Sequence, residues 1–249
     1  MRRTAFAALC LAAAATAGLV TGCQSGDDSA ASKPKGPFAG LSGGQIVERS
    51  MKTTTAASSL RMKGRVPDDE SKGFIDIDMA LDKQGRCAGT LSMNGQGKAD
   101  MIRSGGTVYM KYDEKFLRAQ SEGESKEDTD AAVDMLAGNW TKMAATGQDA
   151  KDIASFCDLD TILGDMKDGD EAATRGKTTK VDGKPAIVLH EKDGGDDYTA
   201  HVATEGKPYL LRIDSGAKAK EQIHLSFGDF DKPVPADKPT GKILDLDAL

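Results

Sequence analysis

Apolar and polar residues alternate along several stretches of the chain, most regularly at residues 75–82. There Ile75, Ile77, Met79 and Leu81 alternate with Asp76, Asp78, Ala80 and Asp82. A period of two is typical of a strand with one buried face. Residues 87–93, 98–103 and 107–112 continue the pattern, separated by short turn signals such as Asn94-Gly95. The spacing predicts an antiparallel meander of four or five strands with one apolar and one polar face.

The last third of the chain predicts a second run of strands. They are expected at residues 174–181, 184–191, 197–204, 209–215 and 221–227. Glycine-bearing turns separate them, for example Asp182-Gly183 and Ser215-Gly216. The tail, residues 232–249, carries three prolines and is expected to wrap the surface.

Helical spacing appears before the first meander and between the two. A slim helix is expected to begin at Ser42 or Gly44 and to end near Leu60. Residues 122–130 form an acidic, solvated stretch, and residues 131–136 predict a short helix. A brief strand at residues 139–143 contains the single tryptophan, and residues 150–166 predict one helix or two short ones.

The first 23 residues have the order of an export signal. Two arginines precede an Ala-rich apolar run at residues 4–19, which is too short for a comfortable bilayer span. The run ends in Val20-Thr21-Gly22-Cys23, which resembles a bacterial lipobox. That resemblance implies acylation of the Cys23 thiol, a good nucleophile, and cleavage between Gly22 and Cys23. The alternatives are an uncleaved amino-terminal anchor and a chance cysteine.

This reading divides the chain into three parts. Residues 1–22 are a signal peptide, residues 23–43 a lipidated amino terminus with a flexible Gly/Ser/Pro-rich tether, and residues 44–249 a single domain. The expected location is extracytoplasmic, on the outer face of the cell membrane, with the lipid as the only anchor. Two acyl chains suffice for stable anchoring, whereas one holds a protein only marginally.

The charge of the chain excludes some partners. The formal net charge is −6, and loss of Arg2 and Arg3 with the signal makes it −8. An acidic chain is unsuited to nucleic acid, which requires a basic face. The same net charge argues against direct docking on an anionic membrane surface.

Two of the four cysteines remain once Cys10 leaves with the signal and Cys23 takes lipid. Cys87 and Cys157 are then an even pair in an exported protein, for which a disulfide is the default. The alternative is a metal or redox pair, but the chain has no CxxC motif to support it.

Candidate catalytic and metal chemistry is sparse. His190, His201 and His224 all fall in predicted strands and are interpreted as ordinary strand residues, since zinc needs three or four ligands in tight geometry. The acidic loops lack the ligand spacing of an EF-hand, and no GxSxG elbow occurs. We expect no enzyme activity, no cofactor and no metal.

Several stretches resemble a known family. "LAGNWTKM", "ASFCDLDTIL" and "DGKPAIVLHEKDGGDDYTAHVATEGKPYLLRID" are similar to actinobacterial lipoproteins of the LppX/LprAFG group, within the LolA-like superfamily. The resemblance covers most of residues 44–232. It implies an α+β fold in which a strongly curved antiparallel half-barrel sheet has helices covering its concave face. The family's concave face is apolar and holds acyl chains.

The resemblance suggests a function and a site. The chain is expected to bind or shuttle an acyl lipid or glycolipid in an apolar groove between sheet and helices. The alternative is a ligand-free cell-surface adaptor or sensor that contacts a partner protein. Either a cavity or a packed core would require the same alternation of residues. The candidate cavity residues are Ile75, Ile77, Met79, Leu81, Leu91, Met93, Met101, Val108 and Met110.

Overall fold

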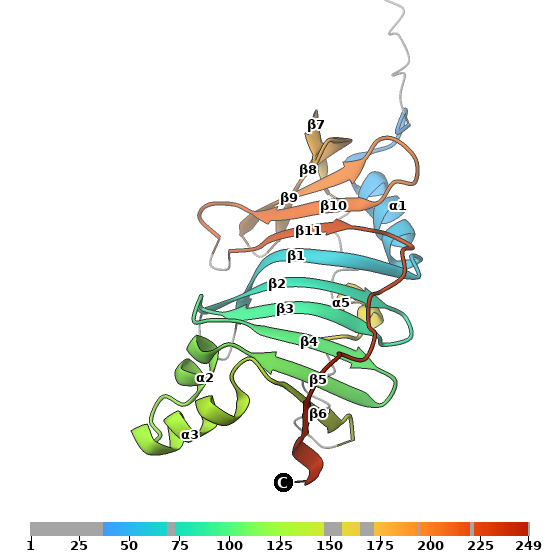
Figure 1. Cartoon of the computed structure of the whole chain (residues 1–249). Coiled ribbons are helices and arrows are strands. Elements are labelled where there is room, and N and C mark those ends of the chain that lie inside the picture. Colours follow the sequence, from blue (N-terminus) through green and yellow to red (C-terminus); the bar gives the residue numbers. More distant parts are fainter. Residues whose placement is uncertain are drawn as a thin grey trace, which may run out of the picture. The chain divides into compact units, whose positions relative to one another are not determined.

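A single curved sheet of twelve strands dominates the computed structural model, which describes residues 37–68, 73–146, 156–164, 172–193, 195–219 and 222–248 (Figure 1). From one edge to the other the strand order is β12-β6-β5-β4-β3-β2-β1-β11-β10-β9-β8-β7. The strands are β1 Ser59–Asp68, β2 Gly73–Asp82, β3 Cys87–Met93, β4 Ala99–Ser104, β5 Thr107–Tyr112, β6 Trp140–Ala144, β7 Thr174–Val181, β8 Lys184–Asp193, β9 Asp196–Ala203, β10 Leu210–Ser215, β11 His224–Gly228 and β12 Ile243–Asp245.

The two predicted meanders are joined into this one sheet by pairing between β1 and β11. The pair is antiparallel and places Met62 opposite Phe227. The strands β1 to β6 and β7 to β11 are otherwise paired with their neighbours in sequence, as the short turns predicted. The predicted α+β architecture with a curved, open, mostly antiparallel sheet is therefore confirmed.

The helices are α1 Gly43–Thr55, α2 Glu114–Gln120, α3 Lys126–Leu136, α5 Leu159–Gly164 and the short 3-10 helix η1 Leu246–Ala248. Ser42 caps α1, as one of the two expected caps, and exchanges hydrogen bonds with Gln45 in a capping box. The predicted end near Leu60 is wrong, because α1 stops at Thr55 and Leu60 already lies in β1.

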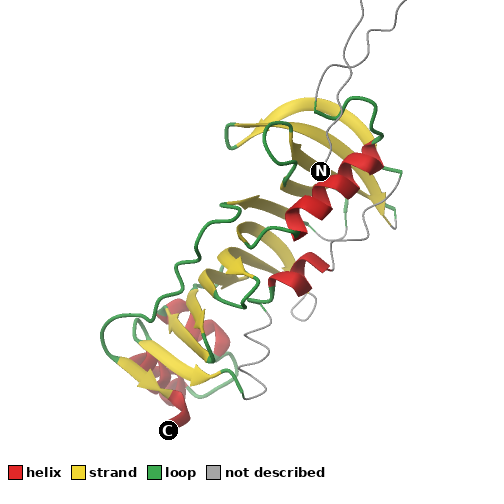
Figure 2. Cartoon of the chain, turned by 90° about the vertical axis from the view of Figure 1, so that its right-hand side faces the viewer, coloured by secondary structure: helices red, strands yellow, loops and turns green. Residues whose placement is uncertain are grey.

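Helices α1 and α5 lie on one face of the sheet, and the tail lies on the opposite face. Figure 2 shows α1 and α5 on one side of the strands and the chain that leads to β12 on the other. Ile46, Val47 and Met51 of α1 join Leu159 and Leu163 of α5 in the main hydrophobic core. On the other side, Val234 and Ala236 of the tail pack on Ala80 and Ala88. The tail therefore follows the surface, as its prolines predicted.

The other differences from the sequence prediction concern short elements. The helix expected at residues 131–136 begins earlier, at Lys126, where Ser125 accepts a hydrogen bond from the Asp128 amide. Helix α2 and strand β12 were not predicted at all; β12 is three residues long and pairs in parallel with β6. Of the helical stretch at 150–166, residues 150–155 and 165–166 lie outside the described residues, and α5 occupies most of the rest.

The folded part begins before residue 44. Phe38 is only 3% exposed and lies in the main core, so part of the predicted tether packs against the domain. The predicted signal peptide, with Gly22, and the lipidation residue Cys23 lie outside the described residues. Among the helices that the structure describes, none has the length and hydropathy needed to span a membrane.

Candidate functional site

The helix side of the sheet is apolar, and we call it the apolar face. Its side chains lie in rows that cross the strands, because residues paired in register point to the same side. The deepest row joins Leu60, Leu81, Cys87 and Val108 across β1, β2, β3 and β5, and Arg103 occupies the β4 position between the last two. Each of these four residues is at most 1% exposed.

A disulfide closes this deep end of the apolar face. Cys87 on β3 is bonded to Cys157, immediately before α5, with the two Cα atoms 5.4 Å apart. The sequence predicted this pairing. Leu159 and Leu163 of α5 are fully buried beside it, so the bond holds the helix against the sheet.

Methionines form the next row. Met62, Met79, Met101 and Met110 lie in register across β1, β2, β4 and β5, and Gly89 occupies the β3 position between them. A Cβ atom on Gly89 would come within 2.7 Å of the Met79 sulfur and 2.1 Å of the Asp78 carbonyl oxygen. Glycine is therefore required there for the strands and the methionine to pack. Methionine is flexible and polarisable, which suits a surface that adapts to variable chains.

Burial decreases toward the opposite end of the strands. Along β2, Leu81 is 0% exposed, Met79 2% and Ile77 9%, while Ile75 is half-buried. The outermost row, Val66, Ile75 and Met93, is half-buried throughout. The apolar face is thus closed at the Leu81 end and partly open at the Ile75 end, which we call the open end.

All nine predicted cavity residues lie on this one face. Six are buried: Ile77, Met79, Leu81, Met101, Val108 and Met110. Ile75, Leu91 and Met93 are half-buried at the open end. The sequence analysis missed other residues of the same face, which lie on or beside β1, β5, α2, β10 and β11: Met62, Val66, Tyr112, Phe116, Ile213 and Ile223.

Helix α2 borders the open end. The Asp113 side chain caps α2 through the Phe116 amide at 2.7 Å and also accepts from the Lys98 amide, which ties the helix to the start of β4. The ring of Phe116 then stacks on Tyr112, with centroids 5.6 Å apart. Burial raises the pKa of the Tyr112 hydroxyl, so this tyrosine stays neutral. Tyr112 and Phe116 therefore place two uncharged aromatic rings at the border of the open end.

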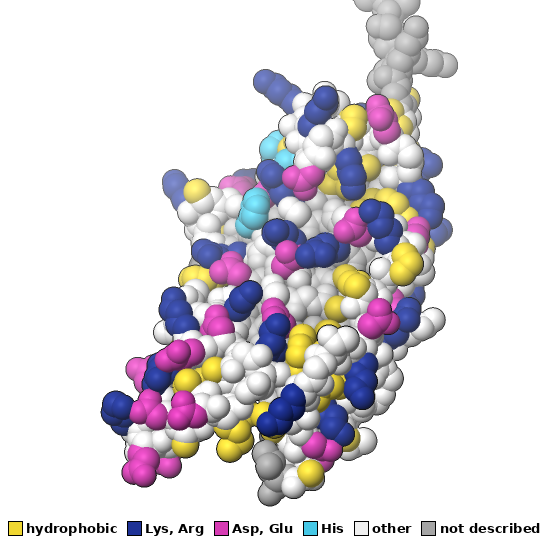
Figure 3. All heavy atoms as spheres, viewed as in Figure 1, with side chains coloured by type: hydrophobic (Ala, Val, Ile, Leu, Met, Phe, Trp, Pro, Cys, Tyr) yellow, Lys and Arg dark blue, Asp and Glu magenta, His cyan; other side chains and the backbone are white. Residues whose placement is uncertain are grey.

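The opposite face of the sheet carries charged side chains, and we call it the charged face. Figure 3 shows basic and acidic side chains intermixed over it. Arg61 pairs with Asp78 at 2.6 Å and Arg65 with Asp76 at 2.8 Å, both across neighbouring strands. Partial burial opposes ionisation of Asp78, but the hydrogen bond from Arg61 prevails and lowers its pKa.

A hollow of about 820 Å³ also lies on the charged face. Its walls combine five charged residues with two of the predicted cavity residues: Lys63, Arg65, Asp76, Asp78 and Lys98, with Ile77 and Leu91. The carboxylates there already pair with Arg65, Arg61 and Lys63. Charged walls make the hollow unsuitable for acyl chains, because burying ionised groups under hydrocarbon is costly.

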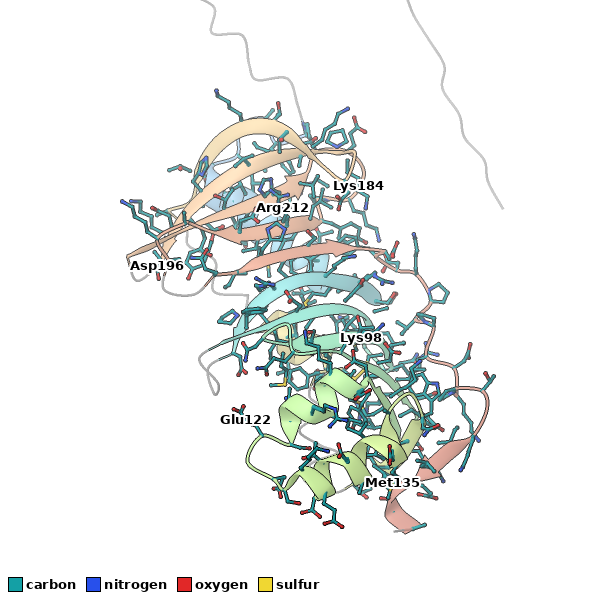
Figure 4. All side chains as sticks on the ribbon, turned by 60° about the vertical axis from the view of Figure 1, so that its left-hand side comes forward. Lys98, Glu122, Met135, Lys184, Asp196 and Arg212 are labelled. Carbon is teal, nitrogen blue, oxygen red and sulfur yellow. A yellow bond between two sulfur atoms is a disulfide. The ribbon has the colours of Figure 1, made fainter. Side chains whose placement is uncertain are left out.

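Two histidines of the charged face share one carboxylate. Asp214 on β10 contacts His201 Nε2 at 3.3 Å and His224 Nδ1 at 2.5 Å, and it also accepts from Arg212 Nε at 2.8 Å (Figure 4 labels Arg212). The sequence analysis interpreted both as ordinary strand histidines and did not reveal that His224 lies beside the same carboxylate as His201. The sequence could not show this contact, because it depends on the register in which β11 pairs with β10.

Burial restricts protonation of His201 in this histidine cluster. Burial, aided by nearby Arg212, lowers the pKa of His201 although Asp214 acts in the opposite direction. His201 is 7% exposed, and its buried Nδ1 has no hydrogen-bond partner among the described residues. Across the described ranges, no three histidine, cysteine or acidic side chains are placed to hold a metal ion.

Comparisons with known proteins address the fold. No family model matches the chain, and no curated protein matches it. The crystal structure of LprF from Mycobacterium bovis is similar over 80% of this chain and 97% of that one, with a TM-score of 0.56 and 15% identity. An uncharacterized conserved protein from Thermus thermophilus has a TM-score of 0.34 at 9% identity, covering 80% of this chain and 96% of that one.

A LolA superfamily protein from Nitrosomonas europaea also matches, with a TM-score of 0.22, 9% identity, and coverage of 80% of this chain and 96% of that one. Of these three likenesses, only that to LprF is close enough to support an argument. It supports the fold implied by the resemblance to the LppX/LprAFG group. The chain has the LprF fold, a curved open sheet with helices over its apolar face.

Proposed function

We propose that this chain is an exported, membrane-anchored lipoprotein that binds or shuttles an acylated lipid on the apolar face of its sheet. One observation carries the proposal: burial along that face falls steadily from the disulfide-closed end to the half-buried row of Val66, Ile75 and Met93. A core packed only for stability has no need of a half-buried apolar end, because each methylene left in contact with water forfeits burial free energy.

The binding mechanism is burial of hydrocarbon. Acyl chains that enter at the open end would lie along the methionine row and lose contact with water, at ~0.8 kcal/mol per methylene. Methionine side chains change rotamer easily, so they would accommodate chains of different length and saturation. The bound lipid's polar group would remain outside the open end, where water reaches it.

The anchor is proposed from the sequence. The apolar run followed by Val20-Thr21-Gly22-Cys23 favours diacylglyceryl transfer to Cys23 and retention on the outer face of the cell membrane. Two acyl chains at Cys23 would hold the protein there. The similarity to LprF supports this proposal through the fold.

Neighbouring residues on opposite faces of β3 provide the test. Leu91 lies on the apolar face, whereas Thr90 lies on the charged face between Asp78 and Asp100. Leu91→Lys would place an ammonium on the path of the acyl chains, and Thr90→Lys would place it among carboxylates. Native mass spectrometry of the chain exported by an actinobacterial host measures the lipid bound to each variant.

We expect lipid bound to the parent chain and to Thr90→Lys, and at least about a tenfold loss in Leu91→Lys, since a charge at an apolar site costs more than about 1.4 kcal/mol. Released lipid would identify the cargo. Retention of lipid by Leu91→Lys would show that the apolar face is not the site. A parent chain that carries no lipid and takes up none from acyl-lipid dispersions would instead support the adaptor alternative.

A further inference from the structure

One edge of the sheet is strongly basic. Strand β7 ends the strand order, and its sequence, TRGKTTKV, contains three cations and no carboxylate. Arg175, Lys177 and Lys180 are all exposed. Neither Lys177 nor Lys180 forms an ion pair with a described residue. This concentration of positive charge contrasts with the intermixed charges of the charged face.

The chain enters the domain beside this edge. Arg175 donates hydrogen bonds of 2.9 Å to the carbonyl oxygens of both Phe38 and Leu41. The backbone at Gly43 packs so closely on Ala173 that a Cβ atom there would lie 2.0 Å from the Ala173 oxygen. Strand β7 therefore holds residues 38–41, at the start of the described part of the chain.

The length of that segment relates the edge to a membrane. Thirteen residues separate Cys23 from Pro37, and a Gly/Ser-rich chain of that length has a mean reach of about 20 Å. If Cys23 carries the proposed lipid, the tether keeps its exit point near the bilayer. Because Arg175 of β7 bonds residues 38 and 41, the tether length leaves the β7 edge within reach of the head groups, and this step rests on the proposed anchor.

We propose that the β7 edge, defined by Arg175, Lys177 and Lys180, docks on anionic phospholipid head groups and orients the domain on the membrane. Attraction between exposed charges acts over about 10 Å or less at physiological salt, so local charge decides the contact. The net charge of −6 predicted no such docking because it averages over the whole chain. The acidic remainder would be repelled by the same head groups, which reinforces one orientation.

The charges also favour lipid over a second protein strand at this edge. Cations on an edge strand discourage pairing with another chain. Lys184 in the next strand adds to the positive charge, and Figure 4 shows it at the turn that follows β7. The exposed Asp182 in that turn is the described carboxylate that lies nearest to Lys180 along the sequence.

Lysine labelling on vesicles tests the proposal with the full processed chain. The protein is added to vesicles of phosphatidylcholine alone or mixed with phosphatidylglycerol, and a membrane-impermeant amine reagent acetylates exposed lysines. Mass spectrometry then gives the rate at each residue. We expect Lys177, Lys180 and Lys184 to react at least about threefold more slowly on the anionic vesicles at low salt, with the difference lost at high salt. The exposed Lys126 on α3 serves as an internal reference that should not change.

Two charge-reversal variants of equal net charge sharpen the result. Lys177→Glu/Lys180→Glu should abolish the protection of Lys184. Lys238→Glu/Lys242→Glu, in the exposed tail, should leave it intact. Protein that floats with both vesicle types but shows equal labelling rates would overturn the docking edge and leave the anchor standing. Protein that fails to float with phosphatidylcholine vesicles, with an unmodified Cys23 peptide, would overturn the anchor and this proposal together.

Discussion

At the scale of single residues, Asp231 secures the point where the sheet ends and the tail begins. Its carboxylate accepts hydrogen bonds from the Ser58 amide at 3.0 Å, from Lys207 Nζ at 2.9 Å and from the Tyr209 hydroxyl at 2.7 Å. These donors, the Tyr209 hydroxyl foremost, hold the pKa of Asp231 far below its usual range. Asp231 also adopts a left-handed φ of 59°, which aspartate tolerates better than most residues.

Asp231→Ala should lower the free energy of unfolding by about 1 kcal/mol more than Asp229→Ala. Asp229 is a matched control because it too has a left-handed φ, of 47°, but its side chain bonds only Lys232 among the described contacts. Both variants lose the same backbone preference, so the difference isolates the Asp231 hydrogen bonds. Urea denaturation followed by circular dichroism measures it; equal losses would mean that these bonds contribute nothing net.

His201 makes stability depend on pH. Because burial lowers its pKa in the folded protein below the ordinary value of 6.5, the unfolded chain binds the proton first as the pH falls. The contribution of His201 to stability is therefore present above pH 6.5 and is lost as the pH drops below it. Urea titrations at about pH 7.5 and about pH 5.5 should show a smaller difference for His201→Gln than for the parent chain.

His190→Gln is the control for this experiment. It removes an exposed histidine from the neighbouring strand β8 and leaves His201 in place, so the parent's pH difference should persist. If His201→Gln retains the whole difference, the pH dependence arises from groups other than His201.

At the scale of elements, the disulfide holds α5 against the sheet. The bond closes a loop across 70 positions of sequence, and chain entropy gives it a contribution of about 4 kcal/mol. Cys87→Ala/Cys157→Ala should lose about that much stability in oxidising buffer. Reduction of the parent chain should produce a similar loss, measured by the midpoint of guanidinium unfolding.

The double variant should also expose the deep end of the apolar face. Amide hydrogen exchange of α5 should accelerate far more than that of α1, which is held to the sheet by its own buried residues and not by the disulfide. Unchanged exchange in α5 would show that Leu159 and Leu163 hold the helix without the bond.

At the scale of the whole molecule, the two faces of the sheet differ in polarity and in what they contact. The apolar face is closed at one end by the disulfide and half-buried at the other, which is the basis of the proposed lipid site. On the charged face, Asp78 and Asp76 pair with arginines of the neighbouring strand. The tail packs on the same face through Val234 and Ala236. The basic β7 edge is separate from both, so cargo binding and orientation on a membrane should respond to different substitutions.

The sequence by itself determined which residues share a face. Alternation along a strand is a local property, so Ile75, Met79 and Leu81 could be assigned to one side without knowledge of their partners. The pairing of Cys87 with Cys157 also followed, since only two cysteines remained for an exported chain. Turn residues between neighbouring strands likewise predicted most of the antiparallel order.

Only the tertiary structure decided how these local elements meet. Pairing of β1 with β11 joins strands from opposite ends of the domain and merges the two meanders, and no local pattern encodes such a register. The burial gradient, the shared Asp214 and the entry of the chain beside β7 depend on the same long-range contacts. Periodicity reflects the geometry of one strand, whereas burial and local charge arise when distant segments pack together.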